Sequence, residues 1–427
     1  MIDRRKLALL SGGALFTPAL LRAQELERRE DLVQGFSRAR LARFQPAMER
    51  EVERGSFNGA VALIARNGEI IHHEAYGHQD NARRVPMSRD SIFLLASMTK
   101  PITSVATMML MEEGRLKITD PIRQWLPELA NLKVEVRDGD RFEDVPLQRP
   151  VTVQDLLRHS SGLIYANDAS PSRRINAMYE QHQIEARDRQ VTGDDMLRNL
   201  GTIPLAFQPG AQFFYSISTD VLGLLLERVS GQRLDRLIAE RLTEPLGMRD
   251  TTWWVEPARR SRIAESIASD PQSAPMWRSY RIEEDQAGKS YLKGGAGLAG
   301  TSGDYFRFAQ MVANGGTLDG RRYLAAPTVN YMLSDHMGTM GGTPAASTGP
   351  GYGFGLGFAV RRQDGLGAAT GHGGDAMWAG AWGTSFTIDR GEKLVGVFMA
   401  QGPSNRGHTR MVFKNMTYGA MVESLRG

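Results

Sequence analysis

The chain of 427 residues contains no cysteine. This absence excludes disulfide bonds, thiolate catalysis and cysteine-based metal sites, and it suits an oxidising compartment. The sequence also lacks the Gly-x-Ser-x-Gly nucleophile elbow, the His-Glu-x-x-His zinc motif, the P-loop and the dinucleotide fingerprint. His72 and His73 alternate along a predicted strand and therefore point to opposite faces, which is typical of a surface strand rather than a metal site. We therefore expect an activity that uses no metal and no cofactor.

The body of the chain has no surplus of either charge. The formal net charge is +4, and the 23% of charged residues is ordinary for a globular protein. Residues 1–23 hold four basic residues and one acidic residue, so this segment accounts for three of the four net positive charges. The remainder is almost neutral and gives no reason to expect nucleic acid as a partner.

Residues 1–24 have the pattern of a signal peptide. A basic start is followed by a mostly apolar stretch over 7–21, and Leu21-Arg22-Ala23 resembles a small-residue cleavage site. The Arg4-Arg5 pair resembles a twin-arginine signal, although an N-terminal helix that stays on the protein is the alternative. No later segment reaches the roughly 20 apolar residues of a membrane span. We expect a periplasmic or secreted protein without a stable membrane span.

Strand signals gather at the two ends of the chain, with helical signals between them. A hairpin is predicted over 60–65 and 69–75, because Asn67-Gly68 favours a tight turn. Further strands are predicted at 354–360, 384–389 and 394–400. These patterns predict an α+β fold (an α/β sandwich), in which the N- and C-terminal parts build one antiparallel sheet flanked by helices.

The expected domains follow from this distribution. Residues 25–115 and 290–427 form the sheet domain, and residues 116–289 form a mostly helical subdomain. Within the subdomain, the charged and weakly periodic stretch 165–195 is expected to be a loop or flap.

Ser97-Met98-Thr99-Lys100 is the strongest chemical signal. Residues three apart share one face of a helix, so this spacing places an amine beside a hydroxyl. A serine is a weak nucleophile until a neighbouring base takes its proton. Pro101 fits the first helical turn and an apolar run follows over 102–111, although a serine at a helix start is also a common N-cap. A second match, from Ser290 to Lys293, runs into two glycines and has no helix behind it.

Three further segments lie near predicted element boundaries. Tyr215 precedes a predicted helix over 217–230, where its phenol could relay a proton or simply pack in the core. Gly371-His372-Gly373-Gly374 is either an edge beside a substrate or a turn with a surface histidine. The glycine-rich stretch 294–300 is interpreted as a structural crossing near the cleft.

In this order, the segments resemble the serine β-lactamase-like family over about residues 35 to 425. This family includes class C β-lactamases, D-alanyl-D-alanine carboxypeptidases and family VIII carboxylesterases. Supporting matches lie at residues 152–163, 245–248 and 303–311. The resemblance implies a β-lactamase/transpeptidase-like fold and a serine hydrolase that works through an acyl-enzyme.

The resemblance also implies roles for individual residues. Ser97 would be the acylated nucleophile, Lys100 its base or proton partner, and Tyr215 the group that carries the proton to the leaving group. His372-Gly373-Gly374 falls where the family has its substrate-binding Lys-Thr-Gly triplet. The N–H of Ser97 and an N–H just after the triplet, that of Asp375, would form the oxyanion hole.

Two departures from the family pattern bear on the substrate, which we expect to be a small ester or amide. Ile217 replaces the usual asparagine, and His372 replaces a lysine that could pair with a carboxylate. Both changes favour a carboxylesterase acting on neutral, short-chain esters. A β-lactamase or D-amino-acid peptidase and a non-catalytic penicillin-recognising sensor remain the alternatives. Four tryptophans either line the pocket or pack in the core: Trp253, Trp254, Trp378 and Trp382.

Overall fold

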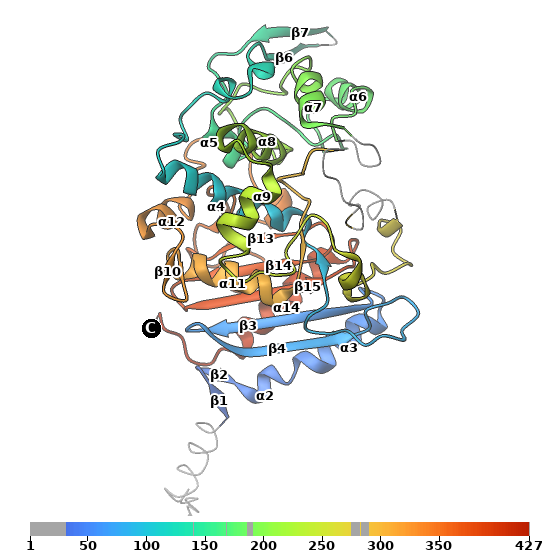
Figure 1. Cartoon of the computed structure of the whole chain (residues 1–427). Helices are drawn as coiled ribbons and strands as arrows, with labels where there is room; N and C mark the ends of the chain where they lie inside the picture. Colours follow the sequence, from blue (N-terminus) through green and yellow to red (C-terminus); the bar gives the residue numbers. More distant parts are fainter. Residues whose placement is uncertain are drawn as a thin grey trace, which may run out of the picture.

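A seven-stranded antiparallel sheet forms the centre of the computed structural model, which describes residues 31–139, 141–167, 169–185, 191–274, 282 and 290–426. The expected signal peptide lies outside these residues. From one edge to the other, the strands are β11 (Tyr352–Phe354), β12 (Ala359–Arg361), β13 (Ala376–Ala379), β14 (Ser385–Asp389), β15 (Leu394–Ala400), β3 (Gly59–Arg66) and β4 (Glu69–Gly77). The sheet therefore combines the two ends of the chain, which confirms the predicted α+β architecture (Figure 1).

Strand β3 shows why the sheet is covered on both faces. All eight of its residues are buried, and they alternate between two hydrophobic clusters. Ala60, Ala62 and Ile64 join the cluster that includes α3 (Phe44–Glu53) and α14 (Arg406–Ala420). The residues between them join the main core, to which α11 (Ser302–Ala313) contributes. Successive side chains of a strand point to opposite faces of the sheet, so a strand that is apolar on both faces lies between two layers of packed elements.

The β3–β4 hairpin turns where the sequence predicted. Asn67 and Gly68 have φ values of 56° and 82°, as a two-residue hairpin turn with positive φ at both positions requires. The register then runs from Arg66 opposite Glu69 to Gly59 opposite Gly77, with an irregularity between Ile64 and Ala65.

Above the sheet in Figure 1 lies a region built mainly of helices. Its central members are α4 (Thr99–Glu112), α5 (Val153–Leu157), α8 (Ser218–Ser230) and α9 (Leu234–Ile238). A reciprocal capping box between Thr152 and Asp155 starts α5, and Gly231 in the left-handed conformation ends α8. The end of α8 agrees with the helix predicted over 217–230. No helix among the described residues combines the length and apolar character that crossing a membrane requires.

Some elements differ from the expectation. Part of the stretch 165–195 is helical, because Ser172 caps α6 (Arg173–Gln181) and Thr192 caps α7 (Gly193–Leu200). The hairpin β6 (Lys133–Asp138) and β7 (Arg141–Pro146) was not predicted, although its first strand alternates polar and apolar residues. The predicted strand 354–360 is interrupted by a turn, with Gly357 at φ 88°.

The remaining short elements complete the chain. They are β1 (Leu32–Val33), β2 (Phe36–Ser37), α2 (Arg38–Leu41), β5 (Phe93–Leu94), β8 (Ala299–Gly300), β9 (Thr317–Leu318), β10 (Arg321–Arg322), α12 (Ala326–Met332) and α13 (Ala345–Thr348). Short 3-10 or π-helical turns occupy Ala96–Met98, Ile122–Gln124, Pro127–Leu129, Ala239–Thr243 and Pro257–Arg262.

Candidate active site

Ser97 is presented by a buried segment. It lies in the 3-10 turn η1 (Ala96–Met98), between strand β5 and helix α4. From residue 91 to residue 108, Ser97 is the one position that is not buried. The packing of its neighbours therefore fixes the backbone of this serine while its own side chain stays accessible.

The residue before the serine is strained. Ala96 is buried and has a φ of 46°, in the left-handed region that alanine rarely adopts. Such strain persists where surrounding structure enforces it, and it is concentrated at functional sites. Here the pairing of β5 with β8 and the start of α4 hold both sides of the turn.

Lys100 meets Ser97 as the three-residue spacing predicts. Its side chain is buried, and its Nζ lies 3.4 Å from Ser97 Oγ, 3.2 Å from the Tyr165 hydroxyl and 2.7 Å from the Gly295 carbonyl oxygen. A charged ammonium can donate to all three oxygens. A neutral amine can instead donate to Gly295 and Tyr165 and accept the serine proton on its lone pair. The contacts thus suit both protonation states.

Tyr215 lies next to this lysine, just before α8. Lys100 Nζ is 4.7 Å from the centre of its ring, and the rings of His159, Tyr165 and Trp378 pack around it. The Tyr215 hydroxyl is buried and has no hydrogen-bond partner among the described residues. A buried hydroxyl without a partner is costly, which marks this position as one that a substrate can complete.

His159 supports Tyr215 from behind. Its ring is 4.7 Å from that of Tyr215, and its Nδ1 accepts a hydrogen bond from the backbone N–H of Ser216. Burial, followed by the nearby charge of Lys100, lowers the pKa of His159 well below its ordinary value. The imidazole is therefore neutral at neutral pH. The sequence contained this residue in a stretch that matched the family, but gave it no role.

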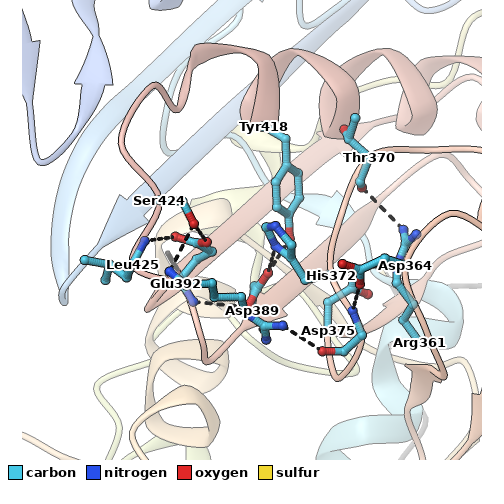
Figure 2. A network of polar contacts seen from close by, with 12 residues as sticks. Arg361, Asp364, Thr370, His372, Asp375, Asp389, Glu392, Tyr418, Ser424 and Leu425 are labelled. Atoms are coloured by element: carbon cyan, nitrogen blue, oxygen red, sulfur yellow. Dashed lines mark hydrogen bonds and ion pairs between the residues drawn. The ribbon is translucent and has the colours of Figure 1, made fainter.

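The structure does not bring the predicted substrate-binding triplet, His372-Gly373-Gly374, to Ser97. His372 Nδ1 donates a hydrogen bond of 2.9 Å to the carboxylate of Asp389, which is the last residue of β14. The N–H of Asp375 is already bonded to the carbonyl oxygen of His372, so it is not free for an oxyanion. Figure 2 shows His372 and Tyr418 directed toward Asp389, with Asp375 beside Arg361.

Strand β13 separates this group from Ser97. Its first residue, Ala376, pairs with Ile388, and its last residue, Ala379, pairs with Ser385 at the opposite end of β14. His372, Gly373, Gly374 and Asp375 precede the first end, which we call the histidine end. The other end, which we call the serine end, is where residues 379–384 meet residues 95–97.

Several contacts place the serine end beside the candidate nucleophile. Strand β13 contacts η1, and Thr384 Oγ1 donates to the carbonyl oxygen of Leu95 at 3.4 Å. A Cβ on Gly380 would collide with that same carbonyl group. Ala381 packs against the cluster that contains Ala96. The segment next to Ser97 is therefore Trp378-Ala379-Gly380. It occupies the position beside the nucleophile that the family resemblance implied for His372-Gly373-Gly374.

Two backbone N–H groups remain available at this end. Within the described part of the chain, neither the N–H of Ser97 nor that of Ala381 donates a hydrogen bond. A pair of free N–H groups on a buried turn and on the adjacent strand end can hold a developing oxyanion. Ala381 thus replaces Asp375 as the candidate second donor, a residue that no sequence pattern had singled out.

Arg410 of α14 adds a positive charge at the serine end. It donates to the carbonyl oxygen of Gly380, and no carboxylate of the described residues lies within ion-pair distance of it. Burial lowers the pKa of Arg410 to about 9. The charge of the nearby Arg406 also lowers this pKa, whereas Tyr215 raises it. This contact could not be predicted from the sequence, because Gly380 follows β13 and Arg410 lies in α14, 30 residues away along the chain.

Of the four tryptophans, Trp378 lies beside the candidate site, and Trp253 and Trp382 pack in the core. Trp378 contacts the rings of Tyr215 and Phe354, at 5.3 and 5.2 Å, and so forms a wall beside the candidate site. Trp253 is buried and donates from Nε1 to the carbonyl oxygen of Lys293, which is a packing role. Trp382 is fully buried in the cluster behind Ala96, while Trp254 is half-buried.

Other sequence candidates have structural explanations. Ser290 and Lys293 lie in a non-helical segment, so they do not share a helix face. His72 bonds to Tyr76 and His73 bonds to Ser302, on opposite faces of β4. Among the residues described, no three His, Cys, Asp or Glu side chains are grouped in a way that could hold a metal ion.

The site on this α+β fold combines a half-buried serine with a buried lysine and a half-buried tyrosine. Two backbone N–H groups without a partner among the described residues complete the arrangement, which is that of a serine-dependent acyl-transfer site. Comparison with known proteins agrees with this class. The Beta-lactamase family profile matches residues 43–415, and the chain therefore belongs to the Beta-lactamase family of serine hydrolases.

Three relatives show the breadth of the similarity. Protein Rv1367c of Mycobacterium tuberculosis is 33% identical, over 84% of this chain and 89% of its own length. Esterase EstB of Burkholderia gladioli is 32% identical, over 82% of this chain and 87% of its own length. The solved structure of EstCE1, a hydrolase with promiscuous acyltransferase activity, is 25% identical, with a TM-score of 0.73 and coverage of 89% and 99%.

Proposed function

We propose that this serine hydrolase is a carboxylesterase that hydrolyses short-chain esters of neutral acyl groups. The observation that carries the proposal is the contact of Ser97 with Lys100 beside a strand end whose side chains are uncharged, Trp378-Ala379-Gly380. A strand without an amine has no direct partner for a substrate carboxylate, whereas an ester with apolar groups can lie against Trp378. The similarity to EstB supports the same substrate class.

In the proposed reaction, Ser97 Oγ attacks the ester carbonyl carbon while its proton passes to the neutral amine of Lys100. The carbonyl oxygen becomes an oxyanion between the N–H groups of Ser97 and Ala381. Collapse of this intermediate breaks the bond to the alcohol, which leaves with a proton delivered through the Tyr215 hydroxyl. Water then attacks the acyl-enzyme by the same proton path in reverse, releasing the acid and regenerating Ser97.

Steady-state hydrolysis of p-nitrophenyl acetate, butyrate and octanoate, measured beside nitrocefin, tests the proposal. Wild type should turn over the short esters much faster than nitrocefin, and Ser97→Ala should lose both activities by at least about 10³-fold. Ester turnover that survives in Ser97→Ala would show that another residue is the nucleophile. A binding protein of the sensor type would bind the ligand in both forms without turnover.

A second candidate is a β-lactamase or D-amino-acid peptidase, whose substrates carry a carboxylate. Arg410 is the observation that favours it, because this cation lies at the serine end without an acidic partner among the described residues. Nitrocefin cleavage that dominates over ester hydrolysis, and that falls in Arg410→Gln, would support this candidate. Nitrocefin cleavage that stays low in both proteins would leave the ester as the substrate.

We also propose that the protein acts in the periplasm or outside the cell, on the basis of the signal-like residues 1–24. Mass spectrometry of the mature protein from fractionated cells should find a cleaved N-terminus near residue 24. Replacing Arg4-Arg5 by two lysines should block export if the route is the twin-arginine one. An uncleaved chain in the cytoplasm of the producing organism would contradict the proposal.

A further inference from the structure

A buried carboxylate stands close to the candidate catalytic lysine and has no role in the reaction proposed above. Asp220, in the first turn of α8, is 3% exposed. Its Oδ1 accepts a hydrogen bond of 3.0 Å from the backbone N–H of Gly295. A buried carboxylate is costly unless charges or donors compensate it, so its retention calls for an explanation.

The backbone of Gly295 connects this carboxylate to Lys100, because its N–H bonds to one and its carbonyl oxygen to the other. The carbonyl oxygen of Gly295 accepts the shortest hydrogen bond of the Lys100 ammonium, at 2.7 Å, while its N–H is held by Asp220. The carbonyl oxygen of Gly295 thus points toward Lys100, while its N–H points toward Asp220. The segment also lies close against α8, because a Cβ on Gly294 would collide with the carbonyl oxygen of Thr219.

The absence of a side chain at position 295 allows both charged groups to approach. A Cβ built there would lie 3.1 Å from Asp220 Oδ2 and 3.2 Å from Lys100 Nζ. The carboxylate and the ammonium are therefore no farther apart than the sum of these two distances. At such separations in a buried site, opposite charges interact strongly.

The charged and titratable groups that face Asp220 come from two other segments. The charges of Lys100 in α4 and of Lys293, in the segment before Gly295, act on Asp220, and Asp220 in turn acts on Tyr291 of the same segment. Burial raises the pKa of Asp220, while the charges of Lys100 and Lys293 and the Gly295 N–H act in the opposite direction. Burial, followed by the charge of Asp220, raises the pKa of Tyr291 well above its ordinary value.

We infer that Asp220 is a positioning residue for Lys100: through the Gly295 peptide and its own charge, it holds the amine beside Ser97 Oγ and sets the pH range in which that amine works. The inference rests on the proposed function, since it assigns a task to Asp220 only if Lys100 takes the serine proton. Asp220 does not touch the reacting atoms in this account.

Asp220→Asn tests this inference, because it keeps the size of the side chain and removes its charge. We expect kcat for p-nitrophenyl butyrate to fall by about 10- to 100-fold with KM changed less than about threefold. The acid limb of the pH profile of kcat/KM should move to lower pH by at least about half a unit, since loss of a nearby negative charge makes the lysine proton easier to lose.

Two further variants separate positioning from mere stability. Asp304→Asn is a matched control, because Asp304 is also a buried aspartate at the start of a helix, α11, whose carboxylate accepts a hydrogen bond from a backbone N–H, that of Asp250, and another from the Thr251 hydroxyl. It should lower the melting temperature without moving the pH profile. Gly295→Ala keeps both charges but inserts a Cβ between them, and it should lower kcat even if Asp220→Asn does not fold.

Wild-type kcat and an unchanged acid limb in folded Asp220→Asn would overturn the inference, as would wild-type kcat in Gly295→Ala. Turnover that survives in Ser97→Ala would instead overturn the proposed function. Rates are normalised to the folded fraction measured by circular dichroism, so the two failures are distinguishable.

Discussion

The two ends of strand β13 differ in how completely their polar groups are satisfied. At the histidine end, Asp375 is bonded to both Arg361 and Lys414, and Asp389 is bonded to His372, Tyr418 and Arg426 (Figure 2). At the serine end, the Tyr215 hydroxyl and the N–H groups of Ser97 and Ala381 have no partner among the described residues. A structural network completes its own hydrogen bonds, whereas a catalytic site keeps groups open for the substrate.

Lys100→Arg at the serine end should produce the largest effect. Arginine keeps the positive charge but stays protonated, so it cannot accept the serine proton. We expect kcat/KM for p-nitrophenyl butyrate to fall by roughly 10³-fold. Lys414→Arg makes the same change at the histidine end and should retain most of the activity. Near-normal turnover in Lys100→Arg would remove this lysine from the proposed mechanism.

Asp375→Asn at the histidine end should act on stability instead. It removes the anion shared by two buried cations, Arg361 and Lys414, and should lower the free energy of unfolding by about 3 kcal/mol. Urea denaturation followed by circular dichroism measures this loss. The kcat of the folded fraction should stay within about threefold of wild type, and a larger loss would mean that the histidine end takes part in catalysis.

Two tyrosine-to-phenylalanine variants sharpen the same contrast. Tyr215→Phe removes a buried hydroxyl that has no partner, so the melting temperature should stay the same or rise while kcat falls by about 100-fold. Tyr352→Phe removes a hydroxyl bonded to Asp375, Arg361 and Lys414. It should cost about 1–3 kcal/mol of stability and leave kcat unchanged. Reversed outcomes would show that the two ends have been assigned the wrong way round.

The buried histidine behind the site gives a smaller, pH-dependent effect. Because burial holds the pKa of His159 below its unfolded value near 6.5, the unfolded chain binds this proton first as the pH falls. His159 should therefore reduce stability below about pH 6.5, by up to roughly 1.4 kcal/mol per pH unit. His159→Asn, which tolerates the left-handed φ of 55°, should flatten that part of the profile measured by urea denaturation at pH 5 to 7. An unchanged slope would contradict a neutral, buried imidazole.

The features that the sequence predicted correctly are local or strongly periodic. Strand β15 is a continuous apolar run, and β14 alternates polar and apolar residues. The Asn67-Gly68 turn needs positive φ at both positions, and Ser97 and Lys100 meet because they are three residues apart on one helical segment. The partners of Lys100 were not predictable in this way. Tyr165 and Gly295 reach it from 65 and 195 residues away, and only the packing of α4 against these segments brings them together.

The misplaced triplet has a comparable cause. Strand β13 has only four residues, between Asp375 and Gly380, so it carries too little periodicity to be recognised. His372-Gly373-Gly374 resembled the expected motif in composition. However, it lies before the first residue of β13, whereas Ser97 lies beside the last residue of that strand. The N–H of Asp375 is excluded from an oxyanion hole because it donates to the carbonyl oxygen of His372. The pairing of the Asp375 carboxylate with Arg361 of β12 and Lys414 of α14 is equally invisible in the sequence.

Covalent labelling of the intact protein with a fluorophosphonate, followed by peptide mass spectrometry, tests most directly whether Ser97 is the nucleophile. We predict one adduct per chain, located on Ser97, formed at the same rate in wild type and in His372→Ala, and absent from Ser97→Ala. An adduct on another residue would contradict the assignment of the nucleophile. A His372→Ala protein that folds but labels slowly would contradict the division between a catalytic and a structural end of β13.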